Sequence, residues 1–286
     1  MTRRVGIIGY PLKHSVSPIF QQLAFENLRL DFSYDAWEIE PRQLEKYVRR
    51  LVRDEVAGFN VTIPYKSSII PLLDNLSDLA ELAGAVNTVV IEDGSLSGHN
   101  TDIGGFMRSI KQDASFSCSS KNILVIGAGG AARAVLVAMS MEGPSSLTVT
   151  SRNLEKSKLL CKRIEARLSI PIRPLDQKNM STVSLKSDLI VNCTPLGMKH
   201  GKYENETPLA SELISPNSLV VDLVYNPIDT PLLKEARKAG ASTQGGLPML
   251  IYQGAMSFKL WTGKEAPLDL MLSEARKFLE NDASKE

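Results

Sequence analysis

A glycine turn lies between an expected strand and an expected helix in the middle of this chain, and it limits the possible folds strongly. The stretch I-L-V-I-G-A-G-G-A-A-R-A spaces Gly127, Gly129 and Ala132 as G-x-G-x-x-A. The first glycine permits a tight turn, the second lets a pyrophosphate approach the backbone, and the small third residue keeps helix and strand close. Such a turn can also simply join a strand to a helix. With a strand before it and a helix and strand after it, however, it predicts a nucleotide site.

The residues around the turn repeat a strand–helix pattern. Short β-branched runs predict buried strands at 122–126, 147–151, 189–192 and 219–223, and helices are expected at 131–141, 154–168, 248–261 and 268–281. Thr230-Pro231 opens a further helix that Gly240 closes. Strands that alternate with amphipathic helices indicate a parallel sheet covered on both faces. We therefore expect an α/β chain with a doubly wound nucleotide-binding domain.

The N-terminal part of the chain follows a different pattern. Strands are expected at 4–8, 32–39 and 58–63, and helices at 18–28 and 41–53. The runs 86–92 and 95–98 predict a hairpin around Asp93-Gly94. A helix from about Gly105 then leads to a serine-rich stretch at 115–120. This part predicts a second α/β domain.

The composition excludes several other classes of protein. Thirty-three Lys and Arg against 32 Asp and Glu leave a net charge of +1, so neither nucleic acid nor an anionic membrane is an expected partner. No apolar run has the length of a signal peptide core or a membrane span. The three cysteines and three histidines lack the spacing of a disulfide framework or a metal site. We expect no metal and a reducing, cytoplasmic location.

The end of the strand after the glycine turn indicates which nucleotide is bound. NAD-binding folds place an Asp or Glu about 20 residues beyond the glycines. Here the strand leads into Ser151-Arg152-Asn153 instead. Arg152 can stack on adenine and pair with a 2′-phosphate, and Lys156 follows one helical turn later. Alone, Arg152 is better explained as a solvated residue at a helix start, but at this distance from a glycine turn it predicts NADP.

Small polar residues gather on expected loops of the N-terminal part. They occur in H-S-V-S-P, N-V-T-I-P-Y-K, G-A-V-N-T and G-H-N-T-D. Each taken alone has a structural explanation, such as a helix N-cap at Ser17, an Asx-turn or an exposed lysine. Together they supply hydroxyls, amides, one ammonium and one carboxylate beside expected strand ends. That combination suits a small polyhydroxy acid.

These motifs, with N-C-T-P-L-G-M, D-L-V-Y-N-P and G-G-L-P-M-L-I-Y-Q-G-A, occur in an order that resembles the shikimate dehydrogenase family. The resemblance implies a substrate domain at 1–104, a Rossmann-type NADP domain at 105–246, and C-terminal helices at 247–286 that return to the first domain. It implies reversible NADPH-dependent reduction of 3-dehydroshikimate to shikimate, a step in aromatic amino-acid biosynthesis. We expect a monomer or a homodimer, and the sequence does not distinguish between them.

The resemblance also assigns roles to individual residues. It implies that the substrate is held by Ser15 and Ser17 at its carboxylate and by Thr62, Lys66, Asn87, Asp102 and Gln253 at its ring hydroxyls, with Tyr225 facing it. It implies that the nucleotide is held by Gly127, Ala128, Gly129, Gly130, Ala131, Ser151, Arg152, Asn153 and Lys156. Leu223, Gly246 and Met249 would lie near the nicotinamide, and Asp78, in a less distinctive segment, would also contact the cofactor. Many relatives have N-R-T where this chain has S-R-N, so the 2′-phosphate contact depends mainly on Arg152 and Lys156.

Hydride transfer to a ketone leaves negative charge on its oxygen, so a proton donor must stand beside that oxygen. Lys66 is the ammonium of the polar set and the expected donor, with Asp102 orienting it. His14 is a rival acid, since histidine titrates nearer neutrality, but it lies in the expected carboxylate loop. Gly104-Gly105 and Gly245-Gly246 lie at the expected domain crossings, as hinges or as ordinary turns.

Other functions remain open at this point. A quinate/shikimate dehydrogenase of broader specificity would also accept quinate, and it could use NAD. A non-catalytic, ligand-sensing relative would share the fold, although the presence of Lys66, Asp102 and the complete glycine turn argues against it. A nucleotide-binding module for another small acid would leave the N-terminal polar residues unexplained.

Overall fold

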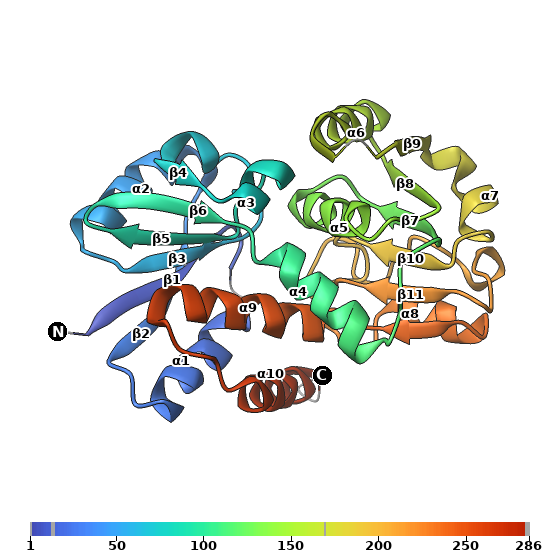
Figure 1. Ribbon diagram of the computed structural model, residues 1–286. Helices are drawn as coiled ribbons and strands as arrows, with labels where there is room; N and C mark the ends of the chain where they lie inside the picture. Colours follow the sequence, from blue (N-terminus) through green and yellow to red (C-terminus); the bar gives the residue numbers. More distant parts are fainter. Residues whose placement is uncertain (1, 13–14, 169, 284–286) are drawn as a thin grey trace. The chain divides into compact units, whose positions relative to one another are not determined.

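The computed structural model describes residues 2–12, 15–168 and 170–283, and the chain divides into two compact units. Unit 1 comprises Met1–Gly105 and Ile251–Phe278, and unit 2 comprises Phe106–Leu250 and Leu279–Glu286. The chain crosses from one unit to the other inside three helices (Figure 1). These are α4 (Asp102–Arg108), α9 (Leu247–Thr262) and α10 (Leu268–Ala283).

Unit 1 is built on a six-stranded mixed sheet with the order β2-β1-β3-β5-β6-β4. Its strands are β1 (Arg3–Gly9), β2 (Phe32–Glu38), β3 (Gly58–Val61), β4 (Asn75–Leu76), β5 (Thr88–Glu92) and β6 (Ser95–His99). The first three run parallel, and β5 is antiparallel to both β3 and β6. The expected hairpin is confirmed, with positive φ values of 50° at Asp93 and 79° at Gly94, as a type I′ turn requires.

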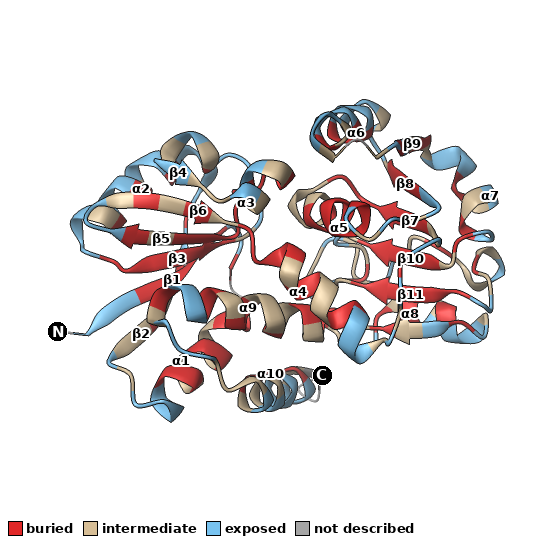
Figure 2. Ribbon diagram, in the orientation of Figure 1, coloured by how far each residue is buried: buried red, intermediate tan, exposed pale blue. Residues whose placement is uncertain are grey.

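Helices cover both faces of the unit 1 sheet: α1 (Ser17–Asn27), α2 (Leu44–Arg53) and the first-unit part of α9, with the short α3 (Asp78–Ala83) beside them. Leu44, Val48 and Leu51 of α2 recur at helical spacing and join the core on one face. On the other face the ring of Phe25 in α1 stacks on Phe32 and Phe258 at centroid distances of 5.0 and 4.8 Å. The central strands β1, β3 and β5 are largely buried (Figure 2), whereas the outer strands β2 and β4 are mostly half-buried or exposed.

Unit 2 contains a six-stranded parallel sheet with the order β12-β11-β10-β7-β8-β9. Its strands are β7 (Asn122–Ile126), β8 (Ser146–Ser151), β9 (Ile172–Asp176), β10 (Leu189–Asn192), β11 (Leu219–Asp222) and β12 (Ser242–Gln244), and its helices include α5 (Gly130–Ser140), α6 (Leu154–Leu168), α7 (Met180–Ser184) and α8 (Pro231–Lys238). The chain moves outward from β7 to β9 and then outward from β10 to β12 on the other side. This reversal at β7 is the doubly wound arrangement expected from the sequence, and it is confirmed.

Some expected boundaries were wrong for identifiable reasons. Strand β9 was not predicted because Pro171 and Pro174 interrupt its pattern, and it lies at the edge of the sheet, where proline is tolerated. Helix α4 begins at Asp102 instead of about Gly105, so the glycine pair is helical and does not form a turn. A Cβ on Gly105 would lie 2.8 Å from the backbone nitrogen of Gln253. The missing side chain therefore lets α4 lie directly against α9 within unit 1.

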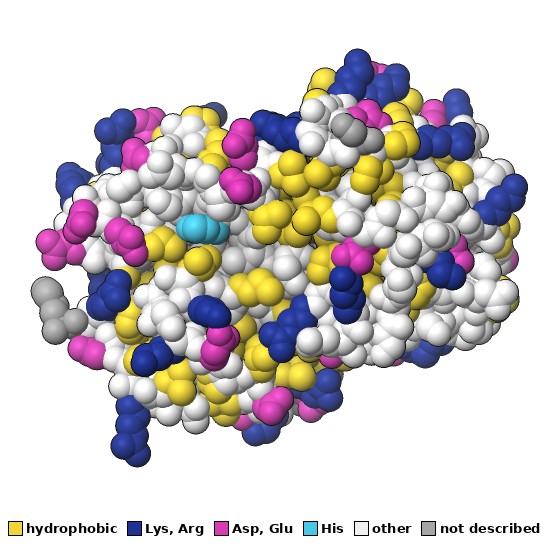
Figure 3. Space-filling model, viewed as in Figure 1, with side chains coloured by type: hydrophobic (Ala, Val, Ile, Leu, Met, Phe, Trp, Pro, Cys, Tyr) yellow, Lys and Arg dark blue, Asp and Glu magenta, His cyan; other side chains and the backbone are white. Residues whose placement is uncertain are grey.

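The surface carries charges of both signs. Figure 3 shows basic and acidic side chains interspersed over the visible face of each unit. Within the residues described, no helix combines the length and the apolar character needed to cross a membrane.

Candidate functional site

Lys66 and Asp102 form an ion pair in unit 1. Lys66 Nζ lies 2.6 Å from Asp102 Oδ2, and the two side chains are 16% and 5% exposed. Asp102 is the first residue of α4, and Lys66 lies in the turn that follows β3. A charge-assisted hydrogen bond of this length, shielded from water, fixes the direction of the ammonium. The two side chains that the sequence singled out for proton transfer are thus in direct contact.

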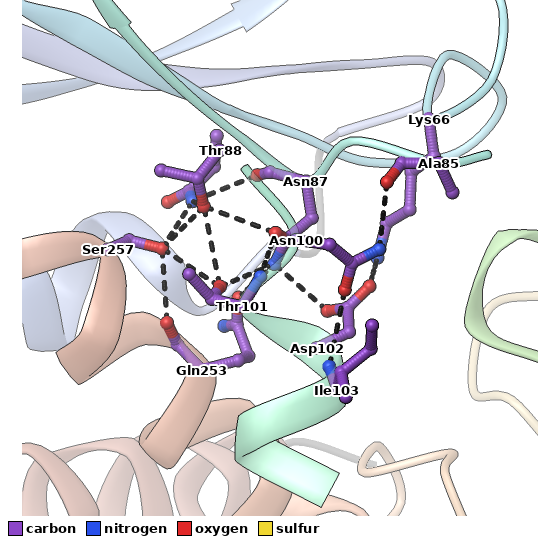
Figure 4. A network of polar contacts seen from close by, with 11 residues as sticks. Lys66, Ala85, Asn87, Thr88, Asn100, Thr101, Asp102, Ile103, Gln253 and Ser257 are labelled. Atoms are coloured by element: carbon purple, nitrogen blue, oxygen red, sulfur yellow. Dashed lines mark hydrogen bonds and ion pairs between the residues drawn. The ribbon is translucent and has the colours of Figure 1, made fainter. Parts of the chain in front are cut away.

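Asn87 connects this ion pair to a helix that is distant in the sequence (Figure 4). Its Nδ2 lies 3.0 Å from Asp102 Oδ1, 2.7 Å from Thr101 Oγ1 and 3.0 Å from Gln253 Oε1. Asn87 Oδ1 accepts a hydrogen bond of 2.7 Å from the backbone N–H of Thr101. An amide nitrogen has two hydrogens, so three acceptors share them. Asn87 therefore orients the Asp102 carboxylate so that its second oxygen meets Lys66.

A second group of buried polar side chains, next to Asn87, holds this residue in place through hydrogen bonds. Thr88 Oγ1 and Ser257 Oγ are 2.7 Å apart, and Asn60 Nδ2 donates to the Asn87 carbonyl at 3.1 Å. Tyr34 donates its hydroxyl to Asn60 Oδ1 at 2.7 Å. Burial raises the pKa of Tyr34 well above its usual value, with a smaller opposing effect from a hydrogen bond to Ser17. A fully satisfied buried network of this kind holds its members rigidly.

Sequence reasoning did not assign roles to Tyr34, Thr88, Thr101 or Ser257. Two features of the sequence point to three of these residues. Thr88 and Thr101 stand within the motifs that were singled out, and Ser257 follows Gln253 by one helical turn on α9. The pairing of β5 with β3, however, decides that Thr88 lies opposite Asn60.

The two serines expected at a substrate carboxylate lie at the start of α1. Ser17 is the first residue of the helix and is 5% exposed, and the N-cap position is Val16, so the interpretation of Ser17 as an N-cap is wrong. The Ser17 side chain is hydrogen-bonded to Tyr34. Ser15 is half-buried, as is Thr62 beyond the end of β3. His14, the rival acid, lies outside the described residues.

The residues expected at the substrate lie in unit 1 and those expected at the cofactor lie in unit 2, with one exception in each set. Tyr225, expected beside the substrate, belongs to unit 2, whereas the other expected substrate residues belong to unit 1. Asp78, expected beside the cofactor, is exposed in the first turn of α3 in unit 1. Leu223, Gly246 and Met249 belong to unit 2, and a Cβ on Gly246 would lie 2.4 Å from the Leu223 carbonyl oxygen.

The glycine turn in unit 2 leaves open space in front of a helix. Gly127 follows β7 with a φ of +119°, a conformation that favours glycine, and a Cβ there would lie 3.1 Å from the backbone of Cys193. Gly129 is the N-cap of α5 and has no side-chain cap, and a Cβ there would meet nothing within 4 Å. Ala132 is fully buried. Free N–H groups at a helix N-terminus, with space before them, can bind phosphate.

Local contacts at the end of β8 leave two cations exposed. Asn153 Oδ1 accepts a 3.0 Å hydrogen bond from the backbone N–H of Lys156 and so caps α6. Ser151 Oγ lies 2.8 Å from Ser157 Oγ. The side chains of Arg152 and Lys156 are exposed at this end of the strand. Ser151 and the Asn153 oxygen are thus engaged in local structure, whereas the two cations can receive an anion.

No metal site is found in the described ranges, where no group of three or more His, Cys, Asp and Glu side chains is placed to hold an ion. Cys118 and Cys161 are buried and free, and Cys193 is free and half-buried. Burial raises the pKa of the Cys118 thiol to about 11, and it also raises that of Cys193. These thiols are therefore not activated as nucleophiles.

Comparison with known families matches most of the chain. Residues 7–89 match the shikimate dehydrogenase substrate binding domain, and residues 109–223 match the shikimate / quinate 5-dehydrogenase family. Residues 246–276 match the shikimate 5'-dehydrogenase C-terminal domain.

Individual relatives are similar over nearly their whole length. A shikimate dehydrogenase (NADP(+)) of Methanopyrus kandleri is 40% identical over 273 residues, which cover 94% of this chain and 93% of the relative. A crystal structure of a shikimate dehydrogenase in complex with NADP+ superposes with a TM-score of 0.89 at 37% identity, covering 97% and 96% of the two chains. The quinate dehydrogenase of Corynebacterium glutamicum in complex with NAD gives a TM-score of 0.87 at 30% identity, covering 96% and 98%.

Proposed function

The chain belongs to the shikimate dehydrogenase family, and we propose that it interconverts 3-dehydroshikimate and shikimate with NADP(H). It is an NADP-dependent oxidoreductase with a two-part α/β fold. The observation that carries the proposal is the shielded Lys66–Asp102 pair held by Asn87, because it supplies a directed proton donor among the hydroxyl-binding groups of unit 1.

Unit 1 would bind the substrate and unit 2 the cofactor. Ser15 and Ser17 would bind the substrate carboxylate. The ring hydroxyls would be held by Thr62, Lys66, Asn87, Asp102 and Gln253, with Tyr225 also facing the substrate. Asn87 and Gln253 are already hydrogen-bonded to each other at 3.0 Å, so both amides lie where they can serve one small ligand. Asp78 would add a cofactor contact from unit 1.

Lys66 would move the proton in both directions. As hydride reaches the carbonyl carbon of 3-dehydroshikimate, the carbonyl π electrons become a lone pair on oxygen, and the Lys66 ammonium donates a proton to it. In the reverse direction the neutral amine of Lys66 accepts the proton of the shikimate hydroxyl. Asp102 directs the ammonium, and its 5% exposure keeps competing water away.

The residues of unit 2 fit NADP(H), which supplies the hydride when it is bound. The glycine turn from Gly127 to Ala131 offers backbone N–H groups to the pyrophosphate. Arg152 and Lys156 supply cations to the 2′-phosphate, beside Ser151 and Asn153. Leu223, Gly246 and Met249 would line the nicotinamide end.

The proposal is tested by a matrix of two substrates and two cofactors. Oxidation of shikimate and of quinate is followed with NADP and with NAD by the absorbance of the reduced nicotinamide. We expect the highest kcat/KM for shikimate with NADP. Comparable kcat/KM values for quinate and shikimate would show the broader specificity instead, and no turnover in any of the four combinations would indicate a non-catalytic relative.

We expect the Ser15→Ala, Ser17→Ala double variant to bind shikimate more weakly while NADP affinity stays nearly unchanged. Each lost hydrogen bond to a charged group costs about 1.5–3 kcal/mol. Calorimetric titration with each ligand measures the effect. Because Ser17 also contacts Tyr34, the thermal unfolding midpoint is compared with that of Ser68→Ala, a control at an exposed hydroxyl in unit 1. Equal losses for both ligands would contradict the assignment.

The first two glycines of the turn, Gly127 and Gly129, should respond differently to alanine. Gly129→Ala should fold normally, because its Cβ meets nothing, but the methyl group should raise KM for NADP by about tenfold or more, ~1.4 kcal/mol, by holding the pyrophosphate off the backbone. Gly127→Ala should instead lower the unfolding temperature, because positive φ costs an L-residue roughly 1–2 kcal/mol. Thermal unfolding and cofactor titration of both variants separate the effects. Equal NADP affinity of Gly129→Ala and wild type would place the pyrophosphate elsewhere.

We also propose a monomer or homodimer that works in the reducing cytoplasm. The three cysteines are free thiols, two of them buried, which suits a reducing compartment. Light scattering on the purified protein would give the oligomeric state.

A further inference from the structure

Tyr203 lies between two cations in unit 2. The guanidinium carbon of Arg152 is 5.7 Å from the centroid of the Tyr203 ring, and Lys202 Nζ is 5.2 Å from it. A hydrogen bond from Arg152, and to a smaller extent one from Lys202, holds the pKa of the Tyr203 hydroxyl below its usual value. Tyr203 thus contacts the positive group of its neighbour Lys202 and that of Arg152, which lies in a segment distant in the sequence.

The order of the sheet explains why these segments meet. Strand β7 lies between β10 and β8, and all three are parallel. Their carboxyl ends therefore share one edge, where the glycine turn follows β7, Arg152 follows β8 and the segment with Tyr203 follows β10. A Cβ on Gly127 would lie 3.1 Å from the backbone of Cys193, just after β10, so this segment leaves the sheet beside the glycine turn.

Among the described residues, the cations at this edge lack the carboxylate partners that other lysines of unit 2 have. Lys158 pairs with Glu155 at 2.7 Å, and Lys238 pairs with Glu235 at 2.5 Å. Within the part of the chain that the structure describes, Arg152, Lys156 and Lys202 form no such ion pair with a carboxylate. Three cations without a neutralising carboxylate, at the edge where a nucleotide is expected, are available to a dianionic group.

We propose that Tyr203 and Lys202 complete a subsite for the 2′-phosphate of the cofactor together with Arg152 and Lys156. The inference rests on the proposed function and extends it to two residues that no motif indicates. Tyr203 is a positioning residue: it covers one face of the planar guanidinium, so that the other face and the N–H edge of Arg152 are directed at adenine and phosphate. Lys202 adds a third positive charge.

The test measures binding of two nucleotides that differ in the 2′-phosphate. Adenosine 2′,5′-bisphosphate and adenosine 5′-monophosphate are titrated calorimetrically into wild type, Tyr203→Ala, Tyr203→Phe and Lys202→Gln. The control Lys238→Gln removes one exposed lysine of unit 2 away from this edge. KM for NADP and for NAD is measured on the same proteins at saturating shikimate.

Tyr203→Ala and Lys202→Gln should each weaken the bisphosphate, and raise KM for NADP, by about three- to tenfold. Binding of the monophosphate, KM for NAD and kcat should change little. Tyr203→Phe keeps the ring face and should retain most of the affinity, and Lys238→Gln should match wild type. Added salt should reduce the effect of Lys202→Gln, since exposed charges are screened.

Two results would overturn the inference: wild-type affinity of Tyr203→Ala and Lys202→Gln for the bisphosphate, or equal losses for both nucleotides. Arg152→Ala in the same series distinguishes this failure from failure of the cofactor assignment. If Arg152→Ala alone loses the preference for the bisphosphate, the cofactor site stands and the roles of Tyr203 and Lys202 are wrong. If wild type binds both nucleotides equally, the 2′-phosphate assignment itself is wrong.

Discussion

Replacing Lys66 with alanine should lower kcat for shikimate oxidation by about 10²–10⁴-fold, the usual contribution of a positioned acid or base. KM for shikimate should change far less, because Lys66 would make one of several hydroxyl contacts, whereas proton transfer would depend on it alone. Steady-state kinetics over a range of shikimate concentrations at saturating NADP measures both parameters.

The matched control is Lys46→Ala, which removes an exposed lysine of α2 in the same unit. Lys66→Ala leaves the nearly buried Asp102 with Asn87 as its neighbour, so circular dichroism and thermal unfolding must show that the variant folds. A folded Lys66→Ala enzyme with more than half of the wild-type kcat would show that another group donates the proton. His14→Ala would then be the next variant to measure.

The second large effect is expected for Arg152→Ala, which should remove most of the preference for NADP over NAD. We expect the wild-type preference in kcat/KM to be on the order of ten- to thousand-fold, since each 1.4 kcal/mol is tenfold. Arg152 can give two hydrogen bonds to a phosphate, but it is exposed, so screening limits the gain. The loss should occur through KM for NADP, with KM for NAD and kcat nearly unchanged.

Kinetics with both cofactors at low and high salt tests this prediction. Arg173→Ala removes another exposed arginine of unit 2, on β9, and should leave the preference intact. A wild-type enzyme that uses NAD as well as NADP, or an Arg152→Ala variant that keeps the full preference, would show that the cofactor is selected elsewhere.

Much of the fold could be predicted because its signals are local. The alternation of short apolar runs and helices defined the doubly wound sheet, and Asp93-Gly94 defined a hairpin whose backbone requires positive φ. Strand β9 could not be predicted, because Pro171 just before it and Pro174 within it contradict the usual strand pattern. Its edge position, which removes the conflict, follows from the order of the sheet and not from the segment itself.

The sequence could predict which residue types make up the candidate site, but it could not predict which of their side chains touch. The motifs indicated Lys66 and Asp102 because an ammonium and a carboxylate are the groups that proton transfer needs. They did not indicate that Asn87 would be hydrogen-bonded to both Asp102 and Gln253. Nor did they indicate that Tyr34 and Ser257 would belong to the buried network around Asn87. Each of these contacts joins residues from different elements.

The chemical groups of this protein, and the places where its backbone must turn, follow from the identity and local order of its residues. The φ of +119° at Gly127 and the cap at Asn153 depend on residues within a few positions, so local physics specifies them. Which of those groups come into contact depends on how the strands and helices pack. Asn87 and Gln253 are 166 positions apart, and their hydrogen bond exists because strand order and helix packing bring β5 and α9 together. Tyr203 reaches Arg152 for the same reason, since β10 and β8 flank β7 in one parallel sheet.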